Sequence, residues 1–222
     1  MVLCAGLGTR LRPLTDVVPK PLVPIAGVPM VVRTLQQLRA AGVERVVINV
    51  HHLGERVRAA LGAGEGLGLA IEYRVEAPQI LGTGGGVRNA LDFFGADEAF
   101  LLVNGDVVID ADFAALGAAH ARSGAAATML VREVPDAARW GAVEVDGDGW
   151  VRRLLGEGEA PAEVTATMFT GVHVLDPRRV GPLLPAQGCI VRSAYRALVP
   201  RGEVFAVRHA GRSSRWACGW AR

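Results

Sequence analysis

The sequence contains one lysine, three cysteines and few aromatic residues, and each shortage limits what the protein can be. Cys4, Cys189 and Cys218 are widely scattered, so they match no metal-binding spacing and form no even set for disulfides. A reduced, cytoplasmic setting is therefore expected. The chain has no run of roughly 18 apolar residues that could span a membrane, and no basic region precedes its first apolar run. We expect a soluble, unexported protein with no membrane partner.

A strong excess of charge of one sign is also missing. Lys and Arg number 24 against 22 Asp and Glu, which gives a formal net charge of +2. That excess is too small to indicate nucleic-acid binding by bulk electrostatics. Aromatic residues make up 5% of the chain and apolar residues 50%, with 28 glycines, which is typical of an α/β protein packed with Ala, Val and Leu. The length of 222 residues suits one large domain.

A glycine turn with cationic residues directly follows the short apolar run 1–5, which we expect to be a buried strand. Gly6 and Gly8 are followed by Arg10 and then by Lys20, the only lysine. This order is how a chain directs backbone N–H groups and positive charge at phosphate. A Gly-x-Gly pair alone also serves ordinary tight turns, and one lysine can fall here by chance. A compact ammonium sits among several oxygens where a planar guanidinium does not fit, which favours a phosphate contact for Lys20.

Apolar strands and helical periods alternate along the rest of the chain. A helix from Pro29 to Gly42 and a continuous apolar strand at 45–50 complete a strand–helix–strand unit, which favours a parallel, right-handed crossover. Further strands are expected at 70–75, 100–103, 126–131, 167–175 and 204–207, and helices at 55–61, 87–94, 112–123, 177–184 and 190–198. An Asp-Gly turn between 141–146 and 150–154 predicts a hairpin.

These elements predict an α/β fold with a Rossmann-like, mixed but mainly parallel sheet flanked by helices. We expect a single domain, with a nucleotide-binding half at about residues 1–125 and a second half at about 126–222 that completes a cleft. In open α/β sheets, ligands bind beyond the carboxyl ends of the strands. The glycine turn, the glycine-rich segment 82–86 and Asp106 should therefore meet at one edge of the sheet.

Asp106 follows an apolar strand through a glycine and is placed to meet a hard cation such as Mg²⁺, although Asn104-Gly105-Asp106 taken alone is more typical of a turn. The segment 82–86 indicates either a flexible loop or a close approach of backbone to a flat base or sugar. His51 and His52 have no carboxylate cluster beside them, so we interpret them as surface residues rather than metal ligands.

Taken together, these motifs resemble the sugar-1-phosphate nucleotidyltransferases, the nucleotide-sugar pyrophosphorylases. The resemblance is carried by Gly6-Leu7-Gly8-Thr9-Arg10-Leu11-Arg12-Pro13-Leu14-Thr15, Pro19-Lys20-Pro21-Leu22, Gly82-Thr83-Gly84-Gly85, Asn104-Gly105-Asp106 and Thr170-Gly171-Val172-His173-Val174-Leu175. The chain is most similar to the short bacterial-type members that act on mannose 1-phosphate or N-acetylmuramate 1-phosphate. The resemblance implies the nucleotide-diphospho-sugar transferase fold and the reaction of an NTP with a sugar 1-phosphate to give an NDP-sugar and pyrophosphate.

The resemblance also implies roles for individual residues. Three are assigned to catalysis, Arg10, Lys20 and Asp106, of which Asp106 would hold Mg²⁺. A larger set is assigned to substrate binding: Gly6, Gly8 and Thr9 for the triphosphate, Gly82 and Thr83 for the base, Gly141, Glu157 and Gly171 for the sugar, and in addition Leu3, Ala5 and Asn104. Catalysis would then consist mostly of positioning and electrostatic stabilisation.

The chain departs from the family pattern in two places. The family ends its catalytic domain with an Asp-x-Gly-Thr-Pro segment whose aspartate is the second metal ligand, whereas residues 212–222 contain no acid. Because the last 46 residues also carry a net charge of about +8, we interpret the chain as cut short or read out of frame near Gly211. Many members carry Glu-Lys-Pro, but here Glu157 precedes a glycine. Arg152 and Arg153 are candidates for the lysine's place, although a guanidinium is not an equivalent donor.

Another class of function stays open. A regulatory or sensing subunit would bind a nucleotide-sugar without turning it over. The missing aspartate favours that alternative, whereas the intact Arg10, Lys20 and Asp106 favour the enzyme. A Rossmann dehydrogenase is disfavoured, because the loop lacks a third glycine and no acidic residue follows at about 20 positions. The sequence names neither the sugar nor the base, and it leaves the oligomeric state open.

Overall fold

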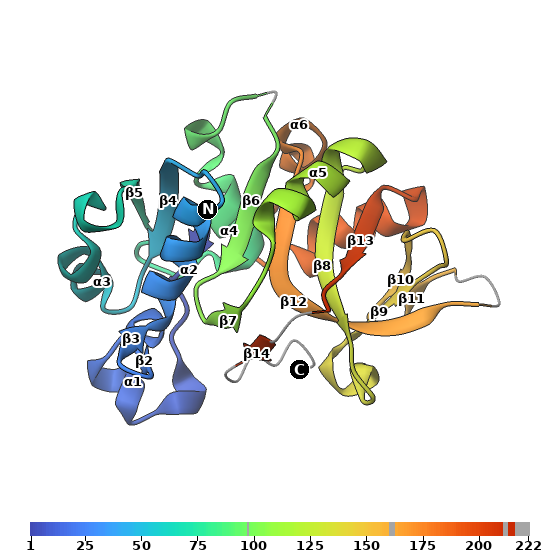
Figure 1. Cartoon of the computed structure of the whole chain (residues 1–222). Helices are drawn as coiled ribbons and strands as arrows, with labels where there is room; N and C mark the ends of the chain where they lie inside the picture. The colour runs from blue at the N-terminus through green and yellow to red at the C-terminus, as the bar shows by residue number, and fades with distance from the viewer. Residues whose placement is uncertain (97, 160–162, 211–212, 216–222) are drawn as a thin grey trace.

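A mixed sheet of ten strands forms the framework of the computed structural model, which describes residues 1–96, 98–159, 163–210 and 213–215 (Figure 1). Eight strands follow the order β11-β10-β9-β12-β6-β1-β4-β5, while β8 pairs with β12 and β13 pairs with β8. The strands are β1 (Val2–Leu3), β4 (Arg45–Val50), β5 (Ala70–Val75), β6 (Phe100–Asn104), β8 (Ala127–Glu133), β9 (Ala142–Val145), β10 (Val151–Leu154), β11 (Glu157–Gly158), β12 (Thr165–Leu175) and β13 (Val204–Arg208). The fold class predicted from the sequence, a mixed α/β sheet flanked by helices, is confirmed.

The first half of the chain builds the parallel part of the sheet. Strands β6, β1, β4 and β5 are parallel neighbours, with Val2 opposite both Ile48 and Val103. Helix α2 (Met30–Ala40) begins directly after Pro29 and ends before Gly42, whose φ of +88° is a left-handed conformation. The expected strand–helix–strand unit is therefore confirmed. The other helices are α1 (Leu14–Val17), α3 (Gly54–Leu61), α4 (Gly82–Arg88), α5 (Phe113–Ser123), α6 (Pro177–Val180) and α7 (Arg196–Leu198).

Strand β12 joins the two halves. Its last residues pair with β6, and its first residues pair with β9. Strand β8 pairs with residues of β12 between Thr167 and Leu175. The register with β8 shifts between Phe169 and His173, and Gly171 within that shift has a φ of +91°. These pairings are antiparallel, and the predicted hairpin is present as β9 and β10. The β9–β10–β11 end of the sheet lies far from β5 (Figure 1).

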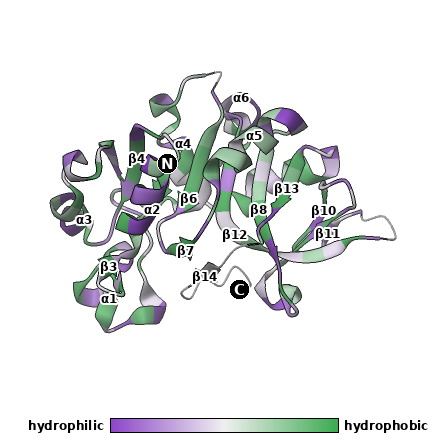
Figure 2. Ribbon diagram, in the orientation of Figure 1, coloured by the Kyte–Doolittle hydropathy of each residue, from purple (hydrophilic) through white to green (hydrophobic). Residues whose placement is uncertain are grey.

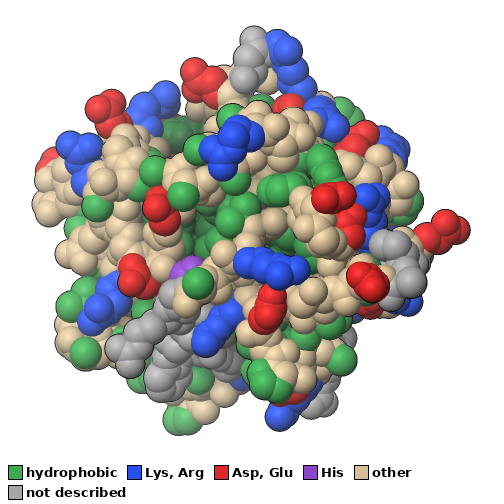
Figure 3. Space-filling view, turned by 45° about the vertical axis from the view of Figure 1, so that its right-hand side comes forward, with side chains coloured by type: hydrophobic (Ala, Val, Ile, Leu, Met, Phe, Trp, Pro, Cys, Tyr) green, Lys and Arg blue, Asp and Glu red, His purple; other side chains and the backbone are tan. Residues whose placement is uncertain are grey.

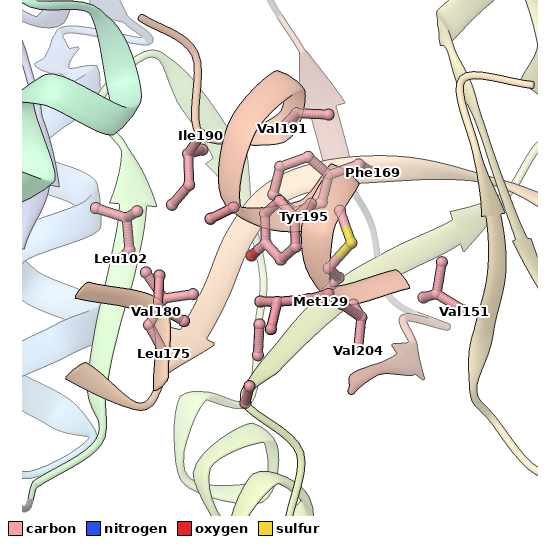
Figure 4. Close-up of a cluster of buried hydrophobic side chains, with 14 of the residues drawn as sticks. Leu102, Met129, Val151, Phe169, Leu175, Val180, Ile190, Val191, Tyr195 and Val204 are labelled. Carbon is pink, nitrogen blue, oxygen red and sulfur yellow. The ribbon is translucent and has the colours of Figure 1, made fainter. Parts of the chain in front are cut away.

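Two buried clusters of apolar side chains form the core. One contains Tyr195, Met129, Phe169 and residues of β6, β8, β9, β10 and β13, and Figure 4 shows the Tyr195 ring close to Phe169 and Met129. The other lies around α2, β4, β6 and α5. Strand β6 contributes to both and is hydrophobic from Phe100 to Val103 (Figure 2), as expected of a central strand buried on two faces.

Some elements differ from the sequence-based expectation. The glycine-rich segment 82–86, predicted as a loop before a helix at 87–94, is itself the start of α4. The small hairpin of β2 (Pro24–Ile25) and β3 (Val28–Pro29) and strand β7 (Val107–Ile109) were not predicted, because strands of two or three residues show no period. The helical stretch expected at 190–198 is a π-helical turn, Val191–Tyr195, followed by α7.

The last described strand lies beside an element of the first half of the chain. Strand β14 (Ser213–Arg215) pairs antiparallel with β7, and Arg215 is in register with Val107, the residue after Asp106. The predicted break near Gly211 concerns a segment of which residues 211–212 and 216–222 lie outside the described residues. In the part of the chain that the structure describes, we find no helix long and apolar enough to cross a membrane.

Candidate active site

A cavity opens where the parallel strands β1, β4 and β6 end, and we call it the Lys20 cavity. Its walls come from the ends of three strands, the segment after β1 and the start of α4. The lining residues are Leu3, Cys4, Ala5, Gly6, Lys20, Pro21, Asn49, Glu76, Ile80, Gly82, Thr83, Asn104 and Asp106. This convergence is expected, because ligands in open α/β sheets bind beyond the carboxyl ends of the strands. It unites the glycine turn, the start of the segment 82–86 and Asp106, as the sequence led us to expect.

Lys20 and Asp106 form an ion pair in this cavity. The Lys20 ammonium, Nζ, donates to Oδ2 of Asp106, which lies 86 residues later in the chain. The Lys20 side chain is only 8% exposed, and that of Asp106 is 20% exposed. An enclosed ammonium needs a partner, because burying an isolated charge is costly. The structure therefore holds one cation and one anion in balance at the centre of the candidate site.

The two glycines of the turn serve different purposes. Gly8 has a φ of +66°, and a Cβ added there would lie 2.8 Å from the Thr15 side chain, so only glycine fits. The Thr15 hydroxyl donates to the Gly8 carbonyl at 2.8 Å, which closes the loop. At Gly6 no described atom lies within 4 Å of such a Cβ, so the space beside its backbone is open. Gly8, Thr9 and Arg10 lie outside the cavity lining, and Thr9 and Arg10 are exposed in the 3₁₀ turn that follows.

A buried carboxylate that the sequence analysis missed organises the cavity wall. Glu76 is 1% exposed, and its Oε2 accepts from the backbone N–H of Leu81 at 2.6 Å. Its Oε1 accepts from Nδ2 of Asn49 at 2.7 Å, while Oδ1 of Asn49 accepts from the backbone N–H of Cys4 at 2.9 Å. The pair thus ties together the ends of β1, β4 and β5 and the start of α4. No local motif marks it, but Asn49 near the end of the apolar strand β4 and Glu76 directly after β5 were a usable signal.

The glycines of α4 pack against the chain itself. A Cβ added at Gly82 would lie 2.7 Å from the Gly188 carbonyl, and one at Gly85 would lie 2.6 Å from the Ala186 carbonyl. The backbone N–H of Gly84 donates to the Gly188 carbonyl at 2.8 Å. The close approach that these glycines permit is therefore to the segment 185–188, and it explains why a glycine-rich segment is helical here.

A second, larger hollow of about 800 Å³ lies in the second half of the molecule, and we call it the Glu157 hollow. It is lined by Ala138, Gly141, Ala142, Glu144, Leu154, Leu155, Gly156, Glu157, Gly158, Val191, Arg192, Arg196, Val199 and Pro200. Two of the predicted sugar residues, Gly141 and Glu157, lie here and not in the Lys20 cavity. The hairpin β9–β10 and strand β11 carry them to the far end of the sheet, which sequence order does not reveal.

The third predicted sugar residue, Gly171, lies beside the Lys20 cavity. A Cβ added there would come within 2.7 Å of Nδ2 of Asn104, so β12 and β6 approach closely at this point. Arg152 and Arg153, the candidates for the missing lysine, are both engaged elsewhere. Arg152 Nε donates to Asp146 at 2.6 Å, and Arg153 Nη2 donates to Glu144 at 2.7 Å.

The donor set of the Lys20 cavity suits a hard cation only in part. Asp106 offers carboxylate oxygen, the ligand type that Mg²⁺ prefers. Across the described residues we find no cluster of three or more His, Cys, Asp or Glu side chains that could hold a metal. This fits an ion that takes one protein carboxylate and completes its shell with phosphate and water. His51 and His52 are half-buried, not surface residues, because each ring contacts a backbone carbonyl, of Glu76 at 2.7 Å and of Thr15 at 3.1 Å.

Cys4 also lines the cavity, but it is not a nucleophile. Burial, with a contribution from the nearby Asp106 carboxylate, raises the pKa of the Cys4 thiol far above its usual range. The thiol is therefore protonated at neutral pH.

The model of the Nucleotidyl transferase family matches residues 1–180. Mannose-1-phosphate guanylyltransferase of Mycobacterium tuberculosis is 36% identical over 206 residues, which cover 91% of this chain and 56% of that protein. UTP–glucose-1-phosphate uridylyltransferase of Synechocystis is 30% identical over 188 residues, with 80% and 48% covered. N-acetylmuramate alpha-1-phosphate uridylyltransferase of Neisseria meningitidis is 46% identical over 115 residues, with 52% and 49% covered.

The chain spans about half the length of these curated relatives. Among solved structures, HddC from Yersinia pseudotuberculosis superposes with a TM-score of 0.77 at 23% identity, covering 96% of this chain and 91% of that chain. The same protein complexed with GMP-PN gives a TM-score of 0.76 at 22% identity. At this identity the likeness establishes the shared fold.

Proposed function

The chain belongs to the nucleotidyl transferase family, and from that premise we propose that it transfers a nucleotidyl group from an NTP to a sugar 1-phosphate. In this reaction a phosphate oxygen of the sugar 1-phosphate forms a bond to the α-phosphorus of the NTP. The bond from the α-phosphorus to the bridging oxygen breaks, and pyrophosphate leaves. The curated relatives are named for different bases and different sugars. Their names support the reaction type, and experiment must identify the base and the sugar.

The observation that carries the proposal is the enclosed Lys20–Asp106 pair beside an open glycine backbone. We place the NTP in the Lys20 cavity, with its base against Leu3, Ala5, Gly82 and Thr83. The triphosphate would lie along Gly6, Gly8 and Thr9. Lys20 and Arg10 would neutralise the charge that develops on the departing pyrophosphate.

We assign Asp106 as the residue that would hold Mg²⁺. When bound there, the ion would neutralise phosphate charge and orient the triphosphate, with phosphate and water supplying its other ligands. Lys20 would then exchange the Asp106 carboxylate for a phosphate oxygen, so the cation stays paired throughout. We further place the reaction in the cytoplasm, which the three scattered cysteines support.

The acceptor would bind in the Glu157 hollow, where Gly141 and Glu157 lie. Its 1-phosphate would extend past Gly171 and Asn104 to reach the α-phosphorus.

A two-part experiment tests the proposal. Thermal shift with each of four NTPs and Mg²⁺ should identify a stabilising nucleotide, since a ligand of the native state raises apparent stability by mass action. With that NTP, pyrophosphate release should require a sugar 1-phosphate from a panel. Binding of nucleotide or nucleotide-sugar with no pyrophosphate release across the panel would instead identify a regulatory or sensing protein.

A further inference from the structure

A chain of three buried hydrogen bonds joins two walls of the Lys20 cavity. The backbone N–H of Leu81 donates to Oε2 of Glu76 at 2.6 Å, and Nδ2 of Asn49 donates to Oε1 of Glu76 at 2.7 Å. Oδ1 of Asn49 accepts from the backbone N–H of Cys4 at 2.9 Å. The chain therefore begins and ends on backbone groups, and two side chains bridge the space between them.

Both ends of this chain lie in segments that line the cavity. Cys4 belongs to the lining segment 3–6, and Leu81 lies between Ile80 and Gly82, which also line it. The proposed position of the NTP base is against these two segments. The separation of the segments, and with it the width of the base site, is therefore fixed by the two bridging side chains.

The bridging pair is held in one conformation. Charged side chains usually lie on the surface, as Figure 3 shows for one face of the molecule, whereas Glu76 is 1% exposed and Asn49 is 3% exposed. The backbone N–H of Glu76 donates to the Val50 carbonyl at 2.8 Å, and its carbonyl accepts from Nδ1 of His51 at 2.7 Å. A Cβ added at Gly86 would lie 2.8 Å from both Glu76 Oε1 and Asn49 Nδ2, so α4 packs directly on the pair.

Resting on the proposed function, we infer that Glu76 and Asn49 are positioning residues for the base of the NTP. Their polar atoms bond to each other and to the backbone of the two walls, so they act on the base through those walls. A site that is already formed loses less entropy when it binds a ligand, and it tolerates fewer shapes of ligand. Nucleotide affinity and discrimination between bases should therefore depend on this pair, while the chemical step depends on Lys20 and Asp106.

Reversing the central hydrogen bond of the chain tests this inference. In Glu76→Gln the new amide nitrogen faces Nδ2 of Asn49, so two donors oppose each other. In Asn49→Asp two carboxylates oppose each other. In the double variant Glu76→Gln/Asn49→Asp the introduced amide can donate to the introduced carboxylate, and the remaining oxygens still accept from the N–H groups of Leu81 and Cys4. The double variant thus restores all three hydrogen bonds with nearly the same side-chain shapes.

Calorimetric titration with each of four NTPs measures the effect on binding. Each single variant should bind the preferred NTP about 10- to 100-fold more weakly and prefer it less strongly over the others. The double variant should recover the affinity and the preference to within about threefold of wild type. In all three variants kcat at saturating NTP should change less than about threefold. Thr128→Val removes a buried hydrogen bond to His120 Nδ1, at 2.9 Å, from a residue that lines neither cavity, and it should bind NTPs like wild type.

The inference is overturned if the single variants keep wild-type affinity and preference, if the double variant stays as weak as they are, or if Thr128→Val loses affinity equally. Should one single variant fail to fold, the other single variant and the double variant carry the same comparison. The titrations need no turnover, so NTP binding without pyrophosphate release contradicts the transferase proposal and still decides the inference. Absence of NTP binding to the wild-type protein overturns both.

Discussion

Lys20 donates a hydrogen bond from Nζ to Oδ2 of Asp106, which joins the segment after β1 to the residue just beyond β6. The family resemblance assigns these two residues to phosphate and to metal. In the structure the Lys20 ammonium and the Asp106 carboxylate form an ion pair with each other. We interpret this pair as the resting form of the site, in which each group holds the place of a substrate charge.

Lys20→Arg should lower kcat by about 10²- to 10³-fold, the cost of losing one well-placed electrostatic contact. The charge is conserved, but a planar guanidinium does not fit a position where the lysine side chain is 8% exposed. Steady-state pyrophosphate release measures the effect. Arg45→Lys, the reverse exchange in an exposed ion pair with Glu72, is the control and should leave kcat unchanged. Near-normal turnover of Lys20→Arg would remove Lys20 from the phosphate site.

Asp106→Asn should raise the Mg²⁺ concentration needed for half-maximal activity by at least about 10-fold. The amide keeps the shape of the side chain but loses the anionic ligand. Mg²⁺ titration of activity, and of the NTP-induced thermal shift, measures this directly. Asp110→Asn removes an exposed carboxylate four residues later and serves as the control. Titration curves of Asp106→Asn that match the wild type would contradict the metal assignment.

Glu76→Gln should lower the free energy of unfolding by about 1–3 kcal/mol. The amide nitrogen cannot accept a hydrogen bond, so either the Leu81 N–H or the Asn49 Nδ2 loses its buried acceptor. Urea denaturation measures the loss. Glu72→Gln, on the exposed face of the same strand β5, should change stability by less than about 0.5 kcal/mol. Equal effects of the two substitutions would mean that the Asn49–Glu76 pair does not organise the cavity wall.

His173 should make the protein sensitive to acid. Burial lowers the pKa of His173 to about 3 from its ordinary value of 6.5. Between these pH values the unfolded chain binds a proton that the native state excludes. The contribution of the neutral His173 to the free energy of unfolding is therefore complete above about pH 6.5. It decreases by about 1.4 kcal/mol per pH unit as the pH falls toward 3.

His173→Gln removes this titration, and its side chain can still form a hydrogen bond with the Tyr195 hydroxyl, which lies 2.5 Å from His173 Nδ1. The difference in free energy of unfolding between wild type and variant should narrow by about 2 kcal/mol from pH 6.5 to pH 4.5. Other titrating groups, including His120, whose pKa burial also lowers, cancel in this difference. Parallel stability–pH profiles would show that His173 is not buried as a neutral imidazole.

The sequence predicts the parts of the molecule that local patterns determine. The unit from β1 through α2 to β4 follows from apolar runs, Pro29 and Gly42 alone. The Lys20 cavity follows from the rule that ligands bind at the carboxyl ends of parallel strands. Long-range contacts decide what was missed or misplaced. The segment 82–86 is helical because it packs against 185–188, and the Glu157 hollow is separate because β9 pairs with the first residues of β12 and β6 pairs with the last.

Following the α-phosphorus of the NTP tests most directly whether the protein transfers a nucleotidyl group to a sugar 1-phosphate. The protein is incubated with Mg²⁺, an α-³²P-labelled NTP chosen from the thermal-shift screen, and its preferred sugar 1-phosphate. Label should enter an NDP-sugar with release of one unlabelled pyrophosphate, and Lys20→Arg should lose at least about 99% of this transfer. Label that remains in the NTP, or that is released as free NMP or NDP with every acceptor, would contradict the proposed transfer.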